Sequence, residues 1–571
     1  MKQILTQLFK TAIQEVFGVE AAKQDPFIQN AARPEYGDYQ ANFAMRLAKL
    51  LGKKPMDIAT AVVAQLDKQK IFKKLEPSGP GFINIFLADD FLRERLQLLV
   101  NDPRLGVSKA SHPETVVVDY ANANVAKEMH VGHIRSIVIG DTIVRLLDLL
   151  GHQVIRQSHL GDWGTQFGML IQYLIETNEI DKPHSVSDLD PLYKKSKQKF
   201  DEDAEFADRS RSRVVALQSG DPATLVKWHK LVEESLHYFQ KIYAKLDVLL
   251  TEEDARGESY YNPMLADVVE QLKQKKLAVD SDGAIVIFMD EFSVPNIIRK
   301  KDGGYLYATT DLAAAQFRMQ KLGATRLIYL TDARQKQHFA MLFATLRKAG
   351  WASENIRLEH IPFGSILGKD NKPFKTRSGE SIKLISLLEE AETRATQLAL
   401  NKNPQLSAVV AEKIGHDIGI GALKYADLRA DKTKDYVFEW DKLLSFEGNT
   451  APYLQNAYVR IQAIFAKGQV IPEQIKNAQI LLTSEVEHNL AIKILDFPDL
   501  IYSVADDLAL HRICEYLYDL AATYHRFYEH CPILSAENST LRDSRLLLSD
   551  LTARTLKLGL NLLGINALEK M

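Results

Sequence analysis

A short run of β-branched residues that leads through a polar loop into a helix constrains this chain most. Residues 115–119 predict a buried strand, and residues 121–128 predict a polar loop. An apolar pattern of helical period at 134–150 ends at Gly151. Between loop and helix stands HVGH, residues 130–133. A strand, a loop and a helix N-terminus in this order typically hold phosphate, because free N–H groups and the helix dipole point at the anion.

Two histidines stand at the predicted helix start. His130 and His133 are three residues apart, so they share one face of the first turn and could donate to phosphate oxygens. Gly132 would let a nucleotide ring approach the backbone, because no Cβ stands in the way. The alternative is that both histidines only cap and fill a helix end.

The tetrad resembles the His-Ile-Gly-His motif of class I aminoacyl-tRNA synthetases, which nucleotidylyltransferases share. The string around it is more specific: ANANVAKEMHVGH (121–133) and GDWGTQFG (161–168) together resemble bacterial arginyl-tRNA synthetases. The resemblance covers essentially the whole chain. It implies that arginine and ATP form arginyl-adenylate and pyrophosphate, and that the arginyl group then passes to the terminal ribose of tRNA.

Changes of pattern divide the 571 residues into several modules, as expected for a chain too long for one core. The first is α+β, with helical periodicity at 4–17 and 39–51 and a strand at 79–87. Alternating strands and helices then predict a doubly wound sheet with its ligand at the carboxyl ends of the strands. A charged helical insertion interrupts the sheet, which we expect to resume at 284–289.

The resemblance gives these modules names and roles. They are an N-terminal domain that contacts the tRNA elbow, a Rossmann-type catalytic domain with its insertion, a connecting region that contacts the tRNA stem, and an all-α anticodon-binding bundle. Their predicted bounds are 1–110 for the N-terminal domain, 114–380 for the catalytic domain with the insertion at about 171–289, 381–446 for the connecting region, and 447–571 for the bundle.

A basic loop, GKDNKPFKTRSG at 368–379, follows the predicted sheet. By composition it is a solvated loop, but by position it resembles the mobile class I loop Lys-Met-Ser-Lys-Ser. Residues 374–378 read FKTRS, so the first lysine of that pattern is missing and the second is Arg377. Lys127 is a candidate replacement, with a solvated loop residue as the alternative. The resemblance implies catalytic roles for His130, His133, Lys127, Lys375 and Arg377, and ATP contacts for Asn122, Val131, Gly132 and Lys369.

Arginine recognition requires a carboxylate, because the planar guanidinium fork is best matched by a bidentate acceptor. Asp119 and Asp311 stand near predicted strand ends, and Tyr307 lies four residues before Asp311. By position these three and Asn124 resemble the arginine-binding residues of the family, and Gln335 resembles a further polar residue of the pocket. The alternative for Asp311 is a helix N-cap.

The last module interleaves aromatic and basic residues, which would suit unstacked anticodon bases. We predict tRNA contacts at Tyr524, Arg526, Arg554 and Lys557, although many aromatic residues of a bundle must belong to its core.

The composition limits the other possibilities. The net charge of −3 requires local basic patches for any nucleic acid. The two cysteines have no zinc spacing and form no disulfide framework, and no stretch has the length or apolarity of a membrane helix or signal peptide. We therefore expect a cytoplasmic protein without membrane contact or zinc, in which Mg²⁺ accompanies ATP without a dedicated metal site. We also expect a monomer.

Other readings stay open on the sequence. A cysteinyl-type enzyme would need zinc ligands, and a glutamyl-type enzyme would need basic residues in the pocket. The third alternative is a catalytically inactive tRNA-binding paralogue, against which the intact HVGH and pocket residues argue.

Overall fold

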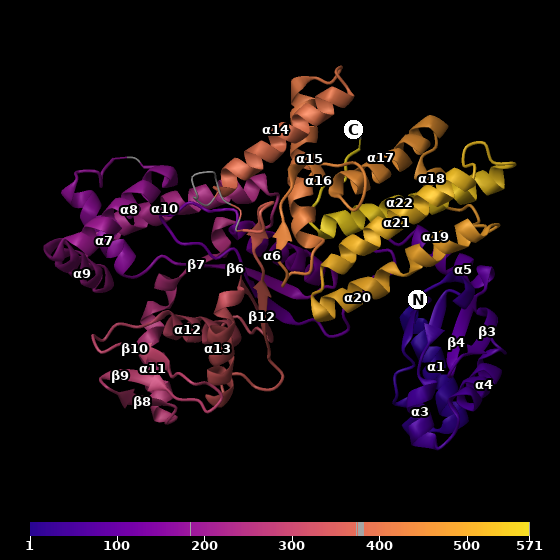
Figure 1. Cartoon of the computed structure of the whole chain (residues 1–571), viewed down its shortest axis with the longest axis horizontal. Helices are drawn as coiled ribbons and strands as arrows, with labels where there is room; N and C mark the ends of the chain where they lie inside the picture. Colours follow the sequence, from indigo (N-terminus) through magenta and orange to yellow (C-terminus); the bar gives the residue numbers. More distant parts are fainter. Residues whose placement is uncertain (183, 373, 375–381, 570–571) are drawn as a thin grey trace.

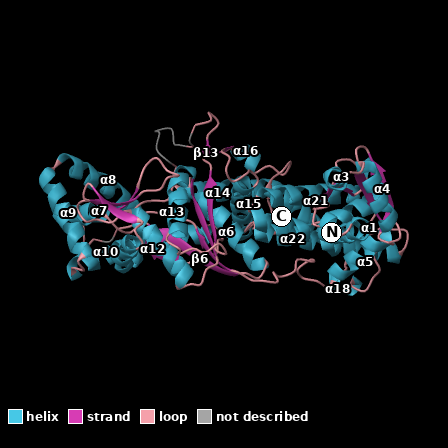
Figure 2. Ribbon diagram, turned by 90° about the horizontal axis from the view of Figure 1, so that it is seen from below, coloured by secondary structure: helices cyan, strands magenta, loops and turns pink. Residues whose placement is uncertain are grey.

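The computed structural model describes residues 1–182, 184–372, 374 and 382–569. The molecule is elongated, with a helical insertion at one end and the parallel sheet in the middle (Figure 1). The C-terminal bundle and the N-terminal domain lie together at the other end, an arrangement that the perpendicular view repeats (Figure 2).

The catalytic domain is built on a five-stranded parallel sheet of order β12-β11-β5-β6-β7. Its strands are Thr115–Asp119 (β5), Gln153–Leu160 (β6), Ala255–Gly257 (β7), Arg326–Asp332 (β11) and Arg357–Phe363 (β12). Valines of β5 are buried on both faces, as is typical of a central parallel strand. The helices that accompany the sheet are His133–Leu149 (α6), Asn262–Gln274 (α11), Tyr307–Gln320 (α12) and Lys336–Lys348 (α13). The predicted doubly wound class is confirmed.

The insertion is shorter than the sequence indicated. Its helices are Thr165–Glu176 (α7), Val186–Glu202 (α8), Ala204–Gln218 (α9) and Pro222–Lys245 (α10). The chain then rejoins the parallel sheet as β7, which pairs with the end of β6. A strand of three residues shows no periodicity, so the pattern of the sequence could not reveal it.

The prediction that the parallel sheet resumes at 284–289 is wrong. Ala284–Ile287 (β9) is the central strand of a separate antiparallel sheet, between Ala278–Ser281 (β8) and Asn296–Arg299 (β10). Asp282 and Gly283 join β8 to β9 with φ of 49° and 81°. Positive φ at both central residues is typical of a two-residue hairpin, and Asp-Gly is its usual sequence.

The N-terminal domain packs helices against a four-stranded antiparallel sheet of order β1-β2-β4-β3. The strands are Ile28–Asn30 (β1), Tyr39–Ala41 (β2), Phe72–Ser78 (β3) and Phe82–Leu87 (β4). The main helices are Lys2–Phe17 (α1), Ala44–Leu51 (α3), Pro55–Leu66 (α4) and Asp89–Val100 (α5). The helix predicted at 39–51 therefore begins only at Ala44, because Tyr39 and Ala41 alternate inward as a strand paired with β4.

Two long helices, Leu384–Lys402 (α14) and Ala408–Leu428 (α15), connect the sheet to the bundle. The two helices pack so closely at Gly415 that a Cβ there would lie only 1.9 Å from Thr396 Oγ1. Short strands Ile366–Leu367 (β13) and Tyr436–Val437 (β14) pair beside them. The bundle helices are Ala451–Gly468 (α17), Glu485–Leu495 (α19), Phe497–Asp507 (α20), His511–His530 (α21) and Ser539–Leu562 (α22). No helix in the described ranges is long and apolar enough to span a membrane.

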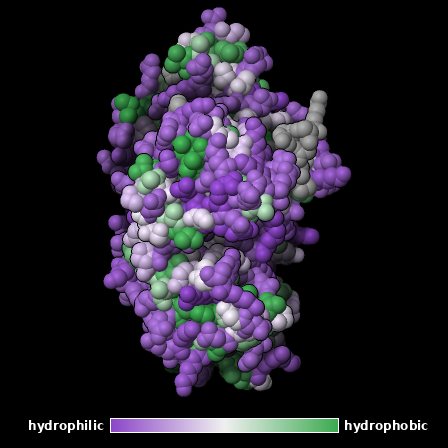
Figure 3. All heavy atoms as spheres, turned by 90° about the vertical axis from the view of Figure 1, so that its left-hand side faces the viewer, coloured by the Kyte–Doolittle hydropathy of each residue, from purple (hydrophilic) through white to green (hydrophobic). Residues whose placement is uncertain are grey.

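The end of the molecule that carries the insertion presents a mostly hydrophilic face with scattered apolar side chains (Figure 3). Charged residues of the insertion pair with one another, as Glu176 does with Lys199 and Arg209. Scattered single apolar side chains are normal on a solvated surface.

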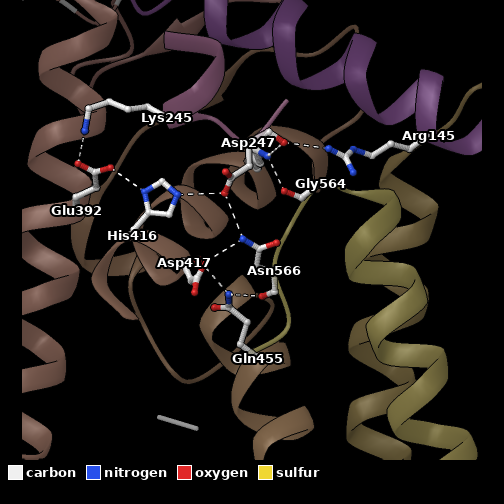
Figure 4. A network of polar contacts seen from close by, with 10 residues as sticks. Arg145, Lys245, Asp247, Glu392, His416, Asp417, Gln455, Gly564 and Asn566 are labelled. Carbon is white, nitrogen blue, oxygen red and sulfur yellow. Dashed lines mark hydrogen bonds and ion pairs between the residues drawn. The ribbon is translucent and has the colours of Figure 1, made fainter. Parts of the chain in front are cut away.

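A polar network joins the modules where the insertion, the connecting helices and the C-terminal residues meet (Figure 4). His416 of α15 lies between Asp247 and Glu392, at 3.1 and 2.9 Å. Asn566 donates to Asp247 and Asp417 at 3.2 and 2.8 Å. The hydrogen bonds that His416 donates to Asp247 and Glu392 raise its pKa to about 9, so this histidine is a cation at neutral pH.

A second polar joint holds the N-terminal domain against the bundle. His488 of α19 contacts Asp38 at 2.9 Å and Asp89 at 2.6 Å. Tyr39 donates to Asp496 at 2.6 Å in a buried position. The two RNA-facing modules of the prediction are therefore fixed to each other by charged contacts.

Candidate active site

The loop between β5 and α6 is held in a strained conformation. Ala121 and Ala126 have φ of 61° and 62°, in the left-handed region that alanine rarely adopts. The Ala121 N–H donates to Ser136 Oγ at 2.9 Å, and the Ala126 N–H donates to Ser235 Oγ at 3.0 Å. The loop thus has one shape, which is set by α6 on one side and α10 on the other.

The backbone N–H groups of the HVGH turn are not free, contrary to the expectation from the sequence. The Val131 N–H donates to the Ile382 carbonyl at 2.8 Å, and the His133 N–H donates to the His130 carbonyl at 2.9 Å. The Gly132 N–H donates to His130 Nδ1, and the His130 N–H donates to His133 Nδ1, both at 3.1 Å. The two imidazoles fold back and accept the N–H groups of His130 and Gly132, and carbonyl oxygens accept those of Val131 and His133. A phosphate would otherwise receive these N–H groups.

The same bonds fix the state of the two histidines. The His130 Nδ1 accepts from Gly132, so the neutral His130 ring bears its proton on Nε2. The His133 Nδ1 lies 3.1 Å from the His130 N–H and 3.2 Å from the His130 carbonyl. Desolvation and the charge of Arg334 lower the pKa of His130. Desolvation and the charge that His130 would carry lower the pKa of His133 to about 4. At neutral pH both imidazoles are therefore uncharged, with ring centroids 4.1 Å apart.

Gly132 makes room for a histidine ring in this structure. A Cβ on Gly132 would lie 2.9 Å from His130 Cε1, closer than a carbon contact allows. That the same glycine also admits a nucleotide ring stays a prediction.

The cations predicted to face the phosphates are only partly described. Lys127 Nζ lies 4.3 Å from the ring centroid of Tyr193, a residue of α8. Lys369 is exposed, and Lys375 and Arg377 lie outside the described residues. Immediately after them, the Leu384 N–H donates to the Met129 carbonyl at 2.8 Å. The chain that follows the basic loop is therefore hydrogen-bonded to the HVGH turn on both sides of His130.

Asp311 and Tyr307 lie on the first turns of α12, as their spacing predicted. Asp311 Oδ2 accepts a hydrogen bond from His338 Nε2 at 2.6 Å, and Oδ1 lies 3.7 Å from His159 Nε2. Tyr307 is 61% exposed, and its ring centroid lies 4.8 Å from that of His338. Burial alone would raise the pKa of Asp311, but the His338 hydrogen bond and the nearby cations lower it. Asp311 is thus a carboxylate and no helix cap.

Glu258, which the sequence did not reveal, shares this site. It begins the short helix Glu258–Tyr261 directly after β7. Desolvation and the charges of Asp311 and Asp162 raise its pKa to about 8. Asp162 accepts from the Ser259 N–H and hydroxyl at 2.9 and 2.6 Å, so it is already satisfied. Besides Asp162, Asp311 is therefore the carboxylate whose charge acts on Glu258.

Asp119 already has a cationic partner within the protein. Its Oδ2 lies 2.7 Å from Arg318 NH1, in a pair whose side chains are almost completely buried. Arg318 also donates to Gln157 at 2.6 Å. Asp119 Oδ1 is buried without a hydrogen-bond partner among the described residues. Contact between Asp119 and the substrate arginine stays a prediction. Of the two oxygens, only Oδ1 lacks a partner and could make that contact.

The remaining predicted pocket residues lie at the edge of the site. Asn122 Oδ1 accepts from the His159 N–H at 3.0 Å, so it holds the end of β6. Asn124 is exposed. A Cβ on Gly161 would lie only 2.2 Å from Asn124 Oδ1. Gln335 is exposed just before α13.

The predicted tRNA residues do not share one surface. Arg526 and Lys557 are exposed, but Tyr524 is only 3% exposed and donates to Ser549 Oγ at 3.1 Å. Arg554 NH1 donates to the Val100 carbonyl at 2.8 Å, so it joins the bundle to the end of α5. Tyr524 also lines a cavity of the bundle, and its contact with tRNA stays a prediction.

A cavity of about 750 Å³ opens between α17 and α21 of the bundle. Arg460 and Lys467 line it from one helix, and His525 and the exposed Tyr528 line it from the other. The two basic residues of α17 were not among the predicted tRNA contacts, although a helical-face count of that segment could have found them.

Three groups that could share a metal ion come together in the described part of the chain: Asp247, His416 and Asp417. They belong to the network of Figure 4, where His416 uses both ring nitrogens for carboxylates. These residues therefore fit an ion-pair network better than a magnesium site, and they do not belong to the HVGH turn.

Comparison with protein families covers nearly the whole chain. Residues 95–440 match the family described as tRNA synthetases class I (R), catalytic domain. Residues 454–571 match the DALR anticodon binding domain, and residues 3–87 match the arginyl tRNA synthetase N terminal domain.

Individual relatives agree. The arginine–tRNA ligases of Shigella flexneri serotype 5b and Escherichia coli O8 are each 50% identical over 554 residues, 96% of both chains. The crystal structure of arginyl-tRNA synthetase from Plasmodium falciparum superimposes with a TM-score of 0.87 at 33% identity, over 100% of this chain and 99% of that one. The Thermus thermophilus arginyl-tRNA synthetase shares the fold, with a TM-score of 0.80 at 23% identity over 100% of both chains.

Proposed function

Because the chain belongs to the class I arginyl-tRNA synthetases, we propose that the Asp311 cluster binds the arginine side chain and that the HVGH turn binds ATP. The enzyme ligates L-arginine to its tRNA through arginyl-adenylate. Full-length similarity to arginine–tRNA ligases gives no support to a different class I specificity or to an inactive paralogue.

The guanidinium lies between Asp311 and Glu258 in this proposal. Desolvation and then the charge of Asp311 raise the pKa of Glu258, and two carboxyl groups that share such a site repel each other when both are charged. A cation placed between them removes that repulsion, and a guanidinium offers enough donors to bond both. Tyr307 covers the side chain from the solvent side. Asn124 and Gln335 receive the amino acid's polar groups.

ATP lies against the other side of the loop. His130 and His133 donate from Nε2 to phosphate oxygens, and the positive end of the α6 dipole favours the same charge. Lys127 leaves the Tyr193 ring to join the phosphates, and Lys369, Lys375 and Arg377 supply the remaining positive charge. Asn122, Val131 and Gly132 form the surface beneath the nucleotide. Such positioning and charge compensation are what transfer at a phosphorus atom requires.

Mg²⁺ enters with ATP, since it prefers oxygen ligands and keeps several waters when it is bound to a triphosphate. No step needs zinc. The proposal keeps a monomer, and the family's role in translation supports a place in the cytoplasm.

The tRNA follows the long axis of the molecule in this proposal. The bundle cavity receives an unstacked anticodon base, because Tyr528 offers a ring and Arg460 and Lys467 offer positive charge. Arg526 and Lys557 add phosphate contacts, Tyr524 lines the same cavity, and Arg554 holds the bundle to the end of α5. The connecting helices face the stem, and the N-terminal domain faces the elbow.

The pair of Asp311 with Glu258 carries the arginine assignment, and Asp311→Asn tests it. A neutral amide would lose a charge-assisted bond of about 1.5–3 kcal/mol, so the arginine KM should rise at least tenfold while the ATP KM stays unchanged. The assay is ATP–pyrophosphate exchange in the presence of tRNA. Asp290→Asn, at an exposed position, is the matched control. An unchanged arginine KM in Asp311→Asn would remove the assignment.

A further inference from the structure

His338 contacts both residues of α12 to which the arginine subsite is assigned. It is the third residue of α13, and its Nε2 donates to Asp311 Oδ2 at 2.6 Å. Its ring lies against Tyr307, with centroids 4.8 Å apart and an interplanar angle of 60°. The side chain of His338 is 13% exposed, so the surrounding residues hold the ring in place.

A guanidinium makes strong demands on the orientation of its acceptor. Its two parallel N–H groups reach two oxygen lone pairs only when the carboxylate plane is correctly turned. The terminal torsion of an aspartate is broad, so the side chain alone does not define that plane. A donor that is fixed on one oxygen defines it and leaves the other lone pairs for a ligand.

We propose that His338 is a positioning residue of the arginine subsite, which holds the Asp311 carboxylate and the Tyr307 ring in the orientation that receives the guanidinium. The inference rests on the proposed function of Asp311. His338 touches neither ATP nor the reacting carboxylate of arginine in this arrangement, so its effect passes through Asp311 and Tyr307.

His338 is better placed for this role than the other imidazole near Asp311. His159 Nε2 lies 3.7 Å from Asp311 Oδ1, beyond hydrogen-bond distance. His159 therefore contributes at most charge. His338 combines a short hydrogen bond with a ring contact, and it comes from a different element than the two residues it holds. This links the start of α13 to the start of α12 across the mouth of the site.

The test compares two substitutions at position 338. His338→Leu removes the donor, and the arginine KM should rise about tenfold, since hydrogen bonds to charged groups are the strong ones. The ATP KM should not change, and kcat at saturating arginine should stay close to its original value. His338→Gln keeps an N–H donor at about the same reach and should restore most of the arginine affinity. Gln337→Leu, an exposed neighbour on the same turn, is the control.

A double-mutant cycle with Asp311→Asn shows whether His338 acts through Asp311. If it does, His338→Leu adds little to the arginine KM once Asp311 is an amide, because the orientation of the carboxylate no longer matters. Additive effects of the two substitutions would overturn the inference, as would an equal rise in the ATP KM or a failure of His338→Gln to recover.

The cycle also separates this inference from the function on which it rests. An unchanged arginine KM in Asp311→Asn alone removes the arginine assignment itself. A raised KM in Asp311→Asn with no effect of His338→Leu keeps the assignment and removes only the role of His338. Thermal unfolding of each variant, compared with Gln337→Leu, identifies any loss of folding.

Discussion

Arginine binding should release a proton from Glu258. Desolvation and two neighbouring carboxylates raise the pKa of Glu258 to about 8 in the free protein, so at neutral pH it is mostly uncharged. A guanidinium placed beside it favours the charged form and lowers that pKa. The complex therefore binds fewer protons than the free protein, and by linkage arginine affinity rises with pH until Glu258 is ionised in both states.

The size of the effect follows from the pKa. If only the ionised carboxylate accepts the guanidinium, the apparent arginine affinity scales with the ionised fraction, about 1% at pH 6 and about half at pH 8. Arginine should then bind about 50-fold more tightly at pH 8 than at pH 6, with a plateau above. The histidines of the HVGH turn have lowered pKa values, so they do not produce this slope.

Isothermal titration calorimetry with arginine at pH 6, 7 and 8 measures the affinity directly. Two buffers of different ionisation enthalpy give the proton count, and about 0.9 proton should be released at pH 7. Glu258→Gln should bind arginine weakly and with no pH dependence, whereas Glu253→Gln, at an exposed carboxylate just before β7, should keep the slope. Equal affinity at pH 6 and 8 in the unchanged protein would refute the reasoning, and so would a slope that survives in Glu258→Gln.

Two further predictions concern positive charges. Lys127→Ala should lower kcat far more than it raises the ATP KM, because the Lys127 ammonium would act when charge redistributes on the triphosphate. The measurement is steady-state aminoacylation, and a near-normal kcat would mean that Lys127 is a solvated residue beside Tyr193. His416 has a pKa raised to about 9 by Asp247 and Glu392, so its stabilising effect is complete below about pH 6.5 and is lost as the pH rises through 9. The difference in Tm between the protein and His416→Ala should therefore shrink from pH 7 to pH 10, and a constant difference would contradict the assigned charge.

Long, strongly periodic elements were predictable from the sequence, and short ones were not. β5 and α6 have the expected bounds to within a residue because a β-branched run and a full helical stripe leave few other arrangements. β7 has three residues and gains its stability from β6, which no local pattern reports. The hairpin of β8 and β9 carried an Asp-Gly signal, but an apolar run such as that of β9 fits a parallel sheet equally well.

The candidate site shows the same division. HVGH and the Tyr307–Asp311 spacing are local, so a sequence motif contains them. Glu258 follows β7, His159 lies near the end of β6, and His338 lies on the first turn of α13. They meet only because the ends of β6 and β7 lie beside the first turns of α12 and α13. The partner of Asp119 likewise comes from Arg318, near the far end of α12. The order of the strands in the sheet determines which of these residues become neighbours, and the spacing of residues in the sequence does not reveal that order.

The helix that follows HVGH, α6, is also bonded to the connecting helix α15 and to the chain before β14. Arg135, two residues beyond His133, is buried and lies 3.2 Å from Asp427 of α15. It also donates to the Lys434 carbonyl at 2.9 Å, directly before β14, which pairs with the strand that precedes the basic loop. Breaking a buried ion pair of this kind costs about 3–5 kcal/mol, more than a surface contact could supply. A displacement of α15 would therefore carry α6 and β13 with it, because these contacts hold the three elements together.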